Sequence, residues 1–145
     1  MMFSLDNVFR KLFFATLALT LVALLAPGDA VLALKVWVAS WLPISQTLVD
    51  QAESSLSLDK LLHCTLFAFL AAFAALAWVQ PLLRWRWLIG LLLLALLTEW
   101  LQQFIPQRGP DVADLAANLV GITVGSCLVL RRGAVGGGSV IRVGS

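Results

Sequence analysis

The chain has 145 residues, of which 61% are hydrophobic and only 12% are charged, and its mean hydropathy is +0.95. Soluble domains carry about 45–50% apolar and about 25% charged residues, so this composition excludes a water-soluble globule and indicates an integral membrane protein. The net charge of +2 is too small, and the ten basic residues are too scattered, for a nucleic-acid-binding protein.

Four apolar stretches are long enough to cross a bilayer as helices, which takes about 20 residues. Prolines end or follow the first three stretches, and two arginines end the fourth. The approximate spans are residues 8–26, 61–79, 87–105 and 112–130. The sequence therefore predicts an all-α, four-transmembrane-helix bundle that forms a single membrane domain over residues 1–132. A flexible, Gly-rich cytoplasmic tail is expected over residues 133–145.

The segment after the first span leaves two questions open. Residues 31–42 are apolar but too short to cross a membrane, and Trp37 and Trp41 share a helical face. We therefore expect an extracytoplasmic interfacial helix between spans one and two. The first span followed by Gly28-Asp29-Ala30 is also typical of a cleavable signal peptide. Cleavage would leave the other three spans in the same orientation.

Basic residues near the span ends predict the orientation, because Lys and Arg are retained in the cytoplasm. Three basic segments fall on one side of the membrane, namely residues 10–11, 84–86 and 131–142. We therefore expect a multi-pass protein of the cell membrane with both termini in the cytoplasm and the loops around Ser54 and Arg108 outside. The indole side chains expected at the cytoplasmic border are those of Trp78, Trp85 and Trp87.

Polar residues inside the spans gather at the outer end. Because a polar side chain within a membrane is costly, each one is expected to bind a partner or to serve a function. Glu99 in span three and Asn118 in span four each lie about 9 Å below the outer end, and His63 opens span two there. The remaining polar candidates at this end are Asp59, Lys60, Gln103, Arg108, Asp111 and Asp114. We expect Glu99, Asn118 and His63 to form one polar pocket, open to the outer surface, with Asp114 and Arg108.

One face of span four carries polar residues in its outer half and glycines in its inner half. Asp111, Asp114, Asn118, Gly121 and Gly125 are spaced three and four apart, which places them on one helical stripe. Small residues at i and i+4 let membrane helices approach closely. The two glycines are therefore expected to contact a neighbouring span just below the polar residues.

Glu99 and His63 are the candidate catalytic groups, and each has a structural alternative. A carboxyl buried in a membrane is a candidate proton acceptor or ligand, but Glu99 could instead stabilise the bundle through Asn118 or Arg108. His63 could act as a general base or simply pair with Asp59.

Arg108 and Asp111 carry similar alternatives. The guanidinium of Arg108 fits a carboxylate or phosphate ligand, but it could also pair with Asp111 or Asp114. Asp111 follows Pro110, which we expect at the first helical position of span four, so its carboxylate suits a helix N-terminus.

A metal site is not predicted. His63, Glu99, Asp111 and Asp114 carry atoms that bind metals, but the chain has neither an H-E-x-x-H motif nor a cysteine cluster. It also has no nucleotide-binding loop or redox pair, so no cofactor is expected.

Together these motifs resemble the VanZ-like family of small bacterial membrane proteins. The resemblance covers residues 58–125, whereas residues 28–58 are longer than is usual in that family and Gly109-Pro110 departs from its pattern. The matching positions are Asp59-Lys60-x-x-His63, Glu99-x-x-x-Gln103, Pro106-x-Arg108, Asp111-x-x-Asp114-x-x-x-Asn118 and Gly121-x-x-x-Gly125. The founding member of the family is associated with raised resistance to the glycopeptide teicoplanin, which acts on a cell-wall precursor outside the membrane.

Two function hypotheses follow from this resemblance and from the polar residues. The first is a non-catalytic protein of the bacterial inner membrane and cell envelope that binds or shields a lipid-linked or cell-wall component at the outer face, and so contributes to antibiotic resistance. Its binding residues would be Asp59, Lys60, Gln103, Arg108, Asp111, Asp114 and Asn118. The alternative is an intramembrane enzyme that acts on a lipid-linked phosphate or amide, with Glu99 or His63 as general base. The expected partners are the lipid bilayer and a lipid-linked precursor.

Overall fold

The computed structural model describes residues 5–41 and 58–136, and this part of the chain contains helices and short connections but no strand. The all-α class is therefore confirmed. The helices are α1 (Leu5–Leu25), α2 (Gly28–Trp41), α4 (Leu58–Ala77), α5 (Pro81–Gln102) and α6 (Val112–Gly136). Helix α6 continues beyond the predicted span end at residue 130. The loop around Ser54 and residues 137–145 of the predicted tail lie outside the described residues.

Three helical segments are long and apolar enough to cross a membrane: Leu5–Leu25, Asp59–Ala77 and Val112–Leu130. Helix α5 is not among them, and its 22 residues include Arg84, Arg86 and Glu99. Large apolar side chains are exposed along all four long helices, including Leu19, Phe69, Leu93 and Leu128. Such surfaces suit lipid rather than water. The chain is thus an integral membrane protein with three candidate spans, and a fourth span in α5 stays a prediction.

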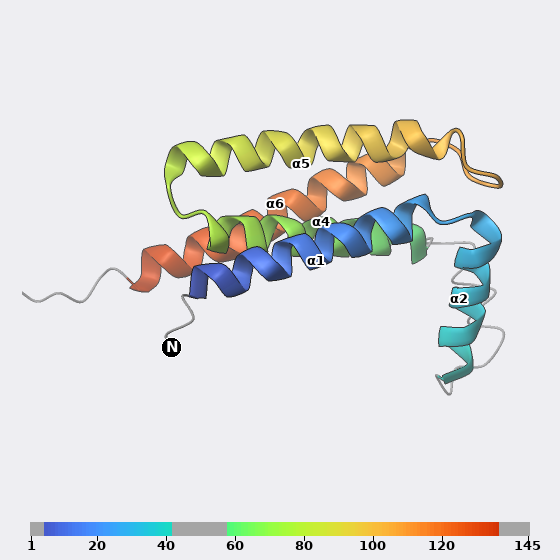
Figure 1. The fold of residues 1–145 in the computed structure, drawn as a ribbon, viewed down its shortest axis with the longest axis horizontal. Helices are drawn as coiled ribbons and strands as arrows, with labels where there is room; N and C mark the ends of the chain where they lie inside the picture. Colours follow the sequence, from blue (N-terminus) through green and yellow to red (C-terminus); the bar gives the residue numbers. More distant parts are fainter. Residues whose placement is uncertain (1–4, 42–57, 137–145) are drawn as a thin grey trace, which may run out of the picture.

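Helices α1, α4, α5 and α6 lie along a common direction, and α2 turns across one end of this bundle (Figure 1). Helix α4 is central, because both α1 and α6 have their most extensive contacts with it. Its side chains Phe67 and Leu70 are fully buried, together with Phe13 and Leu24 of α1. The apolar core therefore runs between α1 and α4 and is closed by Leu91 of α5.

Helices α4 and α6 approach each other closely at two glycines of α6. A Cβ atom on Gly121 would overlap the carbonyl oxygen of Cys64, and one on Gly125 would overlap the carbonyl oxygen of Ala68. Only glycine permits the two backbones to come this close. The predicted glycine contact with a neighbouring span is confirmed, and α4 is that neighbour.

Aromatic rings join α1 to the turn between α4 and α5. The Trp78 ring stacks on the Trp87 ring with centroids 4.1 Å apart, and Phe13 meets the two rings edge-on at 5.2 and 4.9 Å. The Arg10 guanidinium lies 5.8 Å from the centroid of Trp78. Trp78 is 9% exposed and belongs to the core, whereas Trp85 is exposed. Of the three predicted interfacial indoles, Trp78 and Trp87 therefore pack against Phe13 of α1 at this end of the bundle.

At the opposite end, the junction between α1 and α2 packs on the turn between α5 and α6. The Gly28 N–H donates to the Pro106 carbonyl oxygen at 3.3 Å. A Cβ on Gly28 would lie 2.9 Å from the Cβ and the carbonyl oxygen of Gln107, so this position requires glycine. Gln107 itself has a φ of 62°, a left-handed conformation uncommon for a residue with a side chain. This contact holds the end of α1 beside the predicted site.

Candidate functional site

His63 lies at the centre of a buried polar cluster to which α4, α5 and α6 each contribute. Its ring is 1% exposed, and its Nδ1 atom lies 3.0 Å from Asn118 Oδ1 and 3.6 Å from Glu99 Oε1. The other ring nitrogen, Nε2, lies 3.9 Å from Asp114 Oδ2. The structure therefore brings together residues 36 and 55 positions apart from His63. Helix α5 runs antiparallel to α4 and α6, so Glu99 near its end lies level with His63 and Asn118 near the starts of the other two helices.

Glu99 and Asn118 are buried and only partly satisfied. Glu99 Oε2 accepts a hydrogen bond from the backbone N–H of Asp111 at 3.2 Å. Glu99 Oε1 and Asn118 Nδ2 have no hydrogen-bond partner among the described residues, although the two residues are only 6% and 0% exposed. A buried polar atom without a partner costs about 1–3 kcal/mol, and more when it is charged. The cluster thus has a buried acceptor, Glu99 Oε1, and a buried donor, Asn118 Nδ2, that the described residues leave without a hydrogen bond.

Lys60 joins α4 to the beginning of α6 by pairing with two acids. Its Nζ atom lies 3.0 Å from Asp111 Oδ2 and 3.5 Å from Asp114 Oδ1. Asp111 also caps α6, since its Oδ1 accepts the Ala113 N–H at 2.8 Å. This N–H and the Lys60 ammonium hold the pKa of Asp111 below its ordinary value. The N-terminal role of Asp111 is confirmed, but Pro110 precedes the capping residue and is not the first helical residue.

Arg108 binds within the protein, to partners different from those expected. Its Nη1 donates to the carbonyl oxygen of Leu24 at 2.7 Å, and its Nη2 lies 3.8 Å from Asp59 Oδ1. The predicted alternatives, Asp111 and Asp114, are paired with Lys60 instead. The guanidinium is therefore already engaged, and an anionic ligand would have to displace an internal partner.

Gln102 is the site residue that the sequence reasoning missed. Its Nε2 donates to the Leu24 carbonyl oxygen at 3.0 Å, and its side chain is buried. Gln103, the predicted residue, lies exposed after the end of α5 and is not part of the cluster. Gln102 lies three residues after Glu99, a spacing that also places two side chains on one helical face. The backbone oxygen of Leu24 has no signal in the sequence.

Leu24 makes α1 part of the site. A carbonyl in the last turn of a helix has no partner within that helix, and here it accepts bonds from both Gln102 and Arg108. Cleavage after Ala30, which the signal-peptide alternative requires, would remove this acceptor together with the Phe13 contacts.

The charges of the cluster do not balance. Four carboxylates, those of Asp59, Glu99, Asp111 and Asp114, face two basic side chains. With His63 neutral and the carboxylates ionised, the described residues of the cluster carry two more negative than positive charges. Buried charge of one sign is costly, so the deep part of the cluster, around His63 and Glu99, favours a cation or protons.

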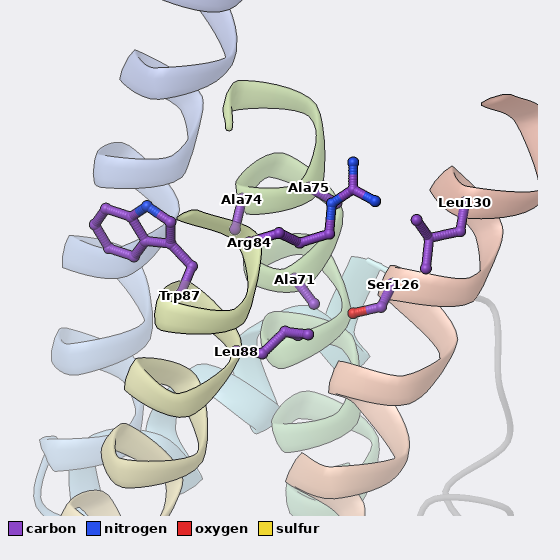
Figure 2. Close-up of a pocket in the computed structure, with 8 residues that line it drawn as sticks. All are labelled: Ala71, Ala74, Ala75, Arg84, Trp87, Leu88, Ser126 and Leu130. Carbon is purple, nitrogen blue, oxygen red and sulfur yellow. The ribbon is translucent and has the colours of Figure 1, made fainter. Parts of the chain in front are cut away.

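A separate crevice lies in the other half of the bundle, between α4, α5 and α6 (Figure 2). It is lined by Ala71, Ala74, Ala75, Arg84, Trp87, Leu88, Ser126 and Leu130. Arg84 reaches over it and donates to the Val79 carbonyl oxygen at 3.1 Å. Its volume of about 20 Å³ is room for a single water molecule and not for a larger ligand. It contains none of the predicted site residues.

A bundle of long apolar helices with a buried acid and histidine cluster at one end defines a class of protein: an integral membrane protein with an intramembrane polar site. A family model described as VanZ/LLP1 matches residues 9–133, which is most of the chain. The chain therefore belongs to the VanZ-like family, as its motifs indicate, and the match extends over α1 and α2 as well. No curated protein and no solved structure matches it.

Proposed function

We propose that this VanZ-like protein acts at the outer face of the bacterial cell membrane. There it binds or shields a lipid-linked or cell-wall component and so contributes to resistance against teicoplanin-type glycopeptides. The buried polar cluster carries the proposal, because ionisable groups within a membrane are expensive and are kept for function. The connection to glycopeptides comes from the resemblance to the founding member of the family.

The proposed topology has four spans, with α5 as the third, and both termini in the cytoplasm. Arg10 lies against Trp78 next to the α4–α5 turn, so two of the basic segments lie at the same end of the bundle. The polar cluster lies at the other end and would face outward. Helix α2 runs across that end (Figure 1), as an interfacial helix would.

Ligand contact is assigned to the outer rim of the cluster. Lys60 and Asp111 are the more accessible pair, with side chains 33% and 48% exposed. A phosphate or peptide carboxylate would bind by exchanging places with Asp59 on Arg108 or with Asp111 on Lys60. Deeper in the cluster, His63 and Asn118 hold α4 and α6 in register for this exchange.

Expression of the full chain in a teicoplanin-susceptible bacterium that lacks VanZ-like proteins tests the proposal. We expect a higher inhibitory concentration of teicoplanin, which Arg108→Met and Glu99→Gln remove while the protein stays folded in the membrane. Thr123→Ala is the control, because Thr123 is exposed and its hydroxyl donates to the Leu119 carbonyl oxygen of its own helix. Unchanged teicoplanin susceptibility with folded, inserted protein would contradict the resistance role.

Mass spectrometry of lipids that co-purify with the intact protein tests the binding step. We expect a lipid-linked precursor with the wild-type protein and its loss with Arg108→Met. A Glu99→Gln protein that keeps the bound lipid but loses resistance would favour the enzyme over the binding protein.

Cysteine labelling tests the topology. In a chain carrying Cys64→Ser and Cys127→Ser, we expect Ser54→Cys to react with an impermeant reagent from outside and Gly136→Cys to react only after the membrane is opened. Labelling of both positions from the same side would overturn the proposed topology.

A further inference from the structure

We propose that the polar cluster is a binding site for a divalent transition-metal ion such as Zn²⁺, with His63, Glu99 and Asp114 as its protein ligands. Each of the three offers one ligand atom, and these atoms all lie within 4.8 Å of one another. The three residues come from α4, α5 and α6, so no sequence motif marks them. Metal sites in helix bundles are built in this way, from inward side chains on facing helices.

Two of the distances between the donor atoms match those around a bound metal ion. Ligand atoms at about 2.0–2.2 Å from Zn²⁺ lie about 3–3.6 Å from one another. His63 Nδ1 lies 3.6 Å from Glu99 Oε1 and 3.0 Å from Asn118 Oδ1. The neutral oxygen of Asn118 is thus placed as a fourth donor. Asp114 Oδ2 lies 3.9 Å from the other ring nitrogen, Nε2, so the Asp114 side chain has to turn toward Nδ1 to share one ion with Glu99.

Glu99 gives a second, independent indication. Its Oε1 has no hydrogen-bond partner among the residues that the structure describes, although the residue is only 6% exposed and the atom points toward the His63 ring. Its Oε2 is already held by the Asp111 N–H. A cation between Oε1 and the imidazole would satisfy the free oxygen without disturbing the bonded one.

Charge and donor type select the class of ion. Counted over the described residues, the cluster has two more negative than positive charges when its carboxylates are ionised, and a divalent cation would neutralise this difference. Ca²⁺ and Mg²⁺ prefer oxygen ligands alone, whereas an imidazole nitrogen favours Zn²⁺ and its neighbours among the transition metals. The Lys60 pair with Asp111 stays outside the proposed ligand set.

Metal binding goes beyond the proposed resistance function and is measured without it, on purified full-length protein in detergent. The protein carries an affinity tag without histidines. It also carries Cys64→Ser and Cys127→Ser, because both cysteines are free thiols that bind Zn²⁺ adventitiously. We expect one Zn²⁺ per chain after dialysis. We also expect a visible Co²⁺ spectrum that Zn²⁺ abolishes by competition.

Variants of the three ligands locate the bound ion. Glu99→Gln, Asp114→Asn and His63→Gln preserve size, and each should weaken Co²⁺ binding by at least about tenfold. Asp29→Asn is the matched control, because Asp29 is an exposed acid outside the proposed ligand set, and its carboxylate accepts the neighbouring Ala30 N–H. Its affinity should equal that of the cysteine-free protein.

Thermal unfolding with and without Zn²⁺ distinguishes a loss of metal binding from a loss of folding. A metal that binds only the folded protein raises its Tm, so Zn²⁺ should stabilise the cysteine-free protein and not Glu99→Gln. Absence of Zn²⁺ binding by the cysteine-free protein would overturn the proposal. Unchanged Co²⁺ affinity in both Glu99→Gln and Asp114→Asn would overturn it equally.

Discussion

The contact between α4 and α6 has a polar half and an apolar half, which hold the same two helices together in different ways. In the polar half, His63 and Asn118 meet through a buried hydrogen bond of 3.0 Å. In the apolar half, Gly121 and Gly125 bring α6 directly against the backbone of α4. Lipid provides no hydrophobic force between helices, so close packing and hydrogen bonds must both contribute.

The difference between the halves shows where stability and chemistry lie. Beside the glycines, the neutral Ser126 Oγ is buried without a hydrogen-bond partner among the described residues. In the polar half, Glu99 Oε1 and Asn118 Nδ2 are the corresponding atoms, and Glu99 is ionisable. We therefore expect that changes in the glycine half affect mainly folding. Changes in the polar half should cost less stability and more function.

The largest effect is expected in the glycine half. Gly125→Ala would place a methyl group on the Ala68 carbonyl oxygen, and because a backbone atom cannot turn aside, the helices must separate. We expect a loss of about 3 kcal/mol in the free energy of unfolding, measured by denaturant titration in detergent. Gly90→Ala is the control, because nothing lies within 4 Å of a Cβ at Gly90. It should be neutral or slightly stabilising, by up to about 1 kcal/mol. Equal losses from Gly125→Ala and Gly90→Ala would show that the close α4–α6 contact does not determine stability.

Asn118→Leu tests the polar half of the same contact. The substitution keeps the branched shape of the side chain but leaves His63 Nδ1 without its hydrogen-bond partner. We expect a loss of about 1–2 kcal/mol, which is smaller than for Gly125→Ala because hydrogen bonds between membrane helices are modest. The same denaturant titration measures it. A loss greater than that of Gly125→Ala would show that the polar half dominates stability.

Gln102→Leu tests the connection of α1 to the polar half. It removes one of the two donors to the Leu24 carbonyl oxygen, while Arg108 keeps the other. We expect a loss of about 1 kcal/mol, seen as a lower Tm. Gln103→Leu should leave the Tm unchanged, because Gln103 is exposed at the end of α5. A Tm lowered by Gln103→Leu and not by Gln102→Leu would show that Gln103 belongs to the site in place of Gln102.

The smallest effect is expected at the rim, where Asp111 pairs with Lys60. Asp111→Asn keeps an oxygen for the Ala113 N–H but loses the ion pair, at a cost of about 0.5 kcal/mol at neutral pH. The pKa of Asp111 is lowered in the folded protein, so its contribution is present above the ordinary value of 3.8 and is lost as the pH falls through the folded pKa. Titrations in metal-free buffer should therefore show the difference between wild type and variant at pH 7 but not at the acid limit. A difference that grows toward low pH would contradict this sign.

Features that depend on local periodicity were predictable from the sequence. The stripe from Asp111 to Gly125 follows from helical spacing alone, and its glycines do contact the neighbouring helix. The joining of Glu99, Asn118 and His63 follows from their equal depth on helices of alternating direction, because the rise per residue is constant. Length and apolar content were likewise enough for the membrane class.

The choice between adjacent residues depended on how each helix is rotated. Gln102 and Gln103 differ by about 100° around the helix axis, and only packing against α1 decides which of them is buried. In the same way, Trp78 is buried because Phe13 and Trp87 pack against it, and the sequence does not show these contacts.

By itself, the sequence determined a helical membrane protein of the VanZ-like family with polar residues gathered at one end and a glycine contact below them. Only the tertiary structure decided which atoms meet: Arg108 with Asp59 and the Leu24 carbonyl oxygen, and Lys60 with Asp111. Spacing along one helix reports which side chains share a face, because the backbone geometry is fixed. It carries no information on the crossing of separate helices or on backbone acceptors, which all residue types share.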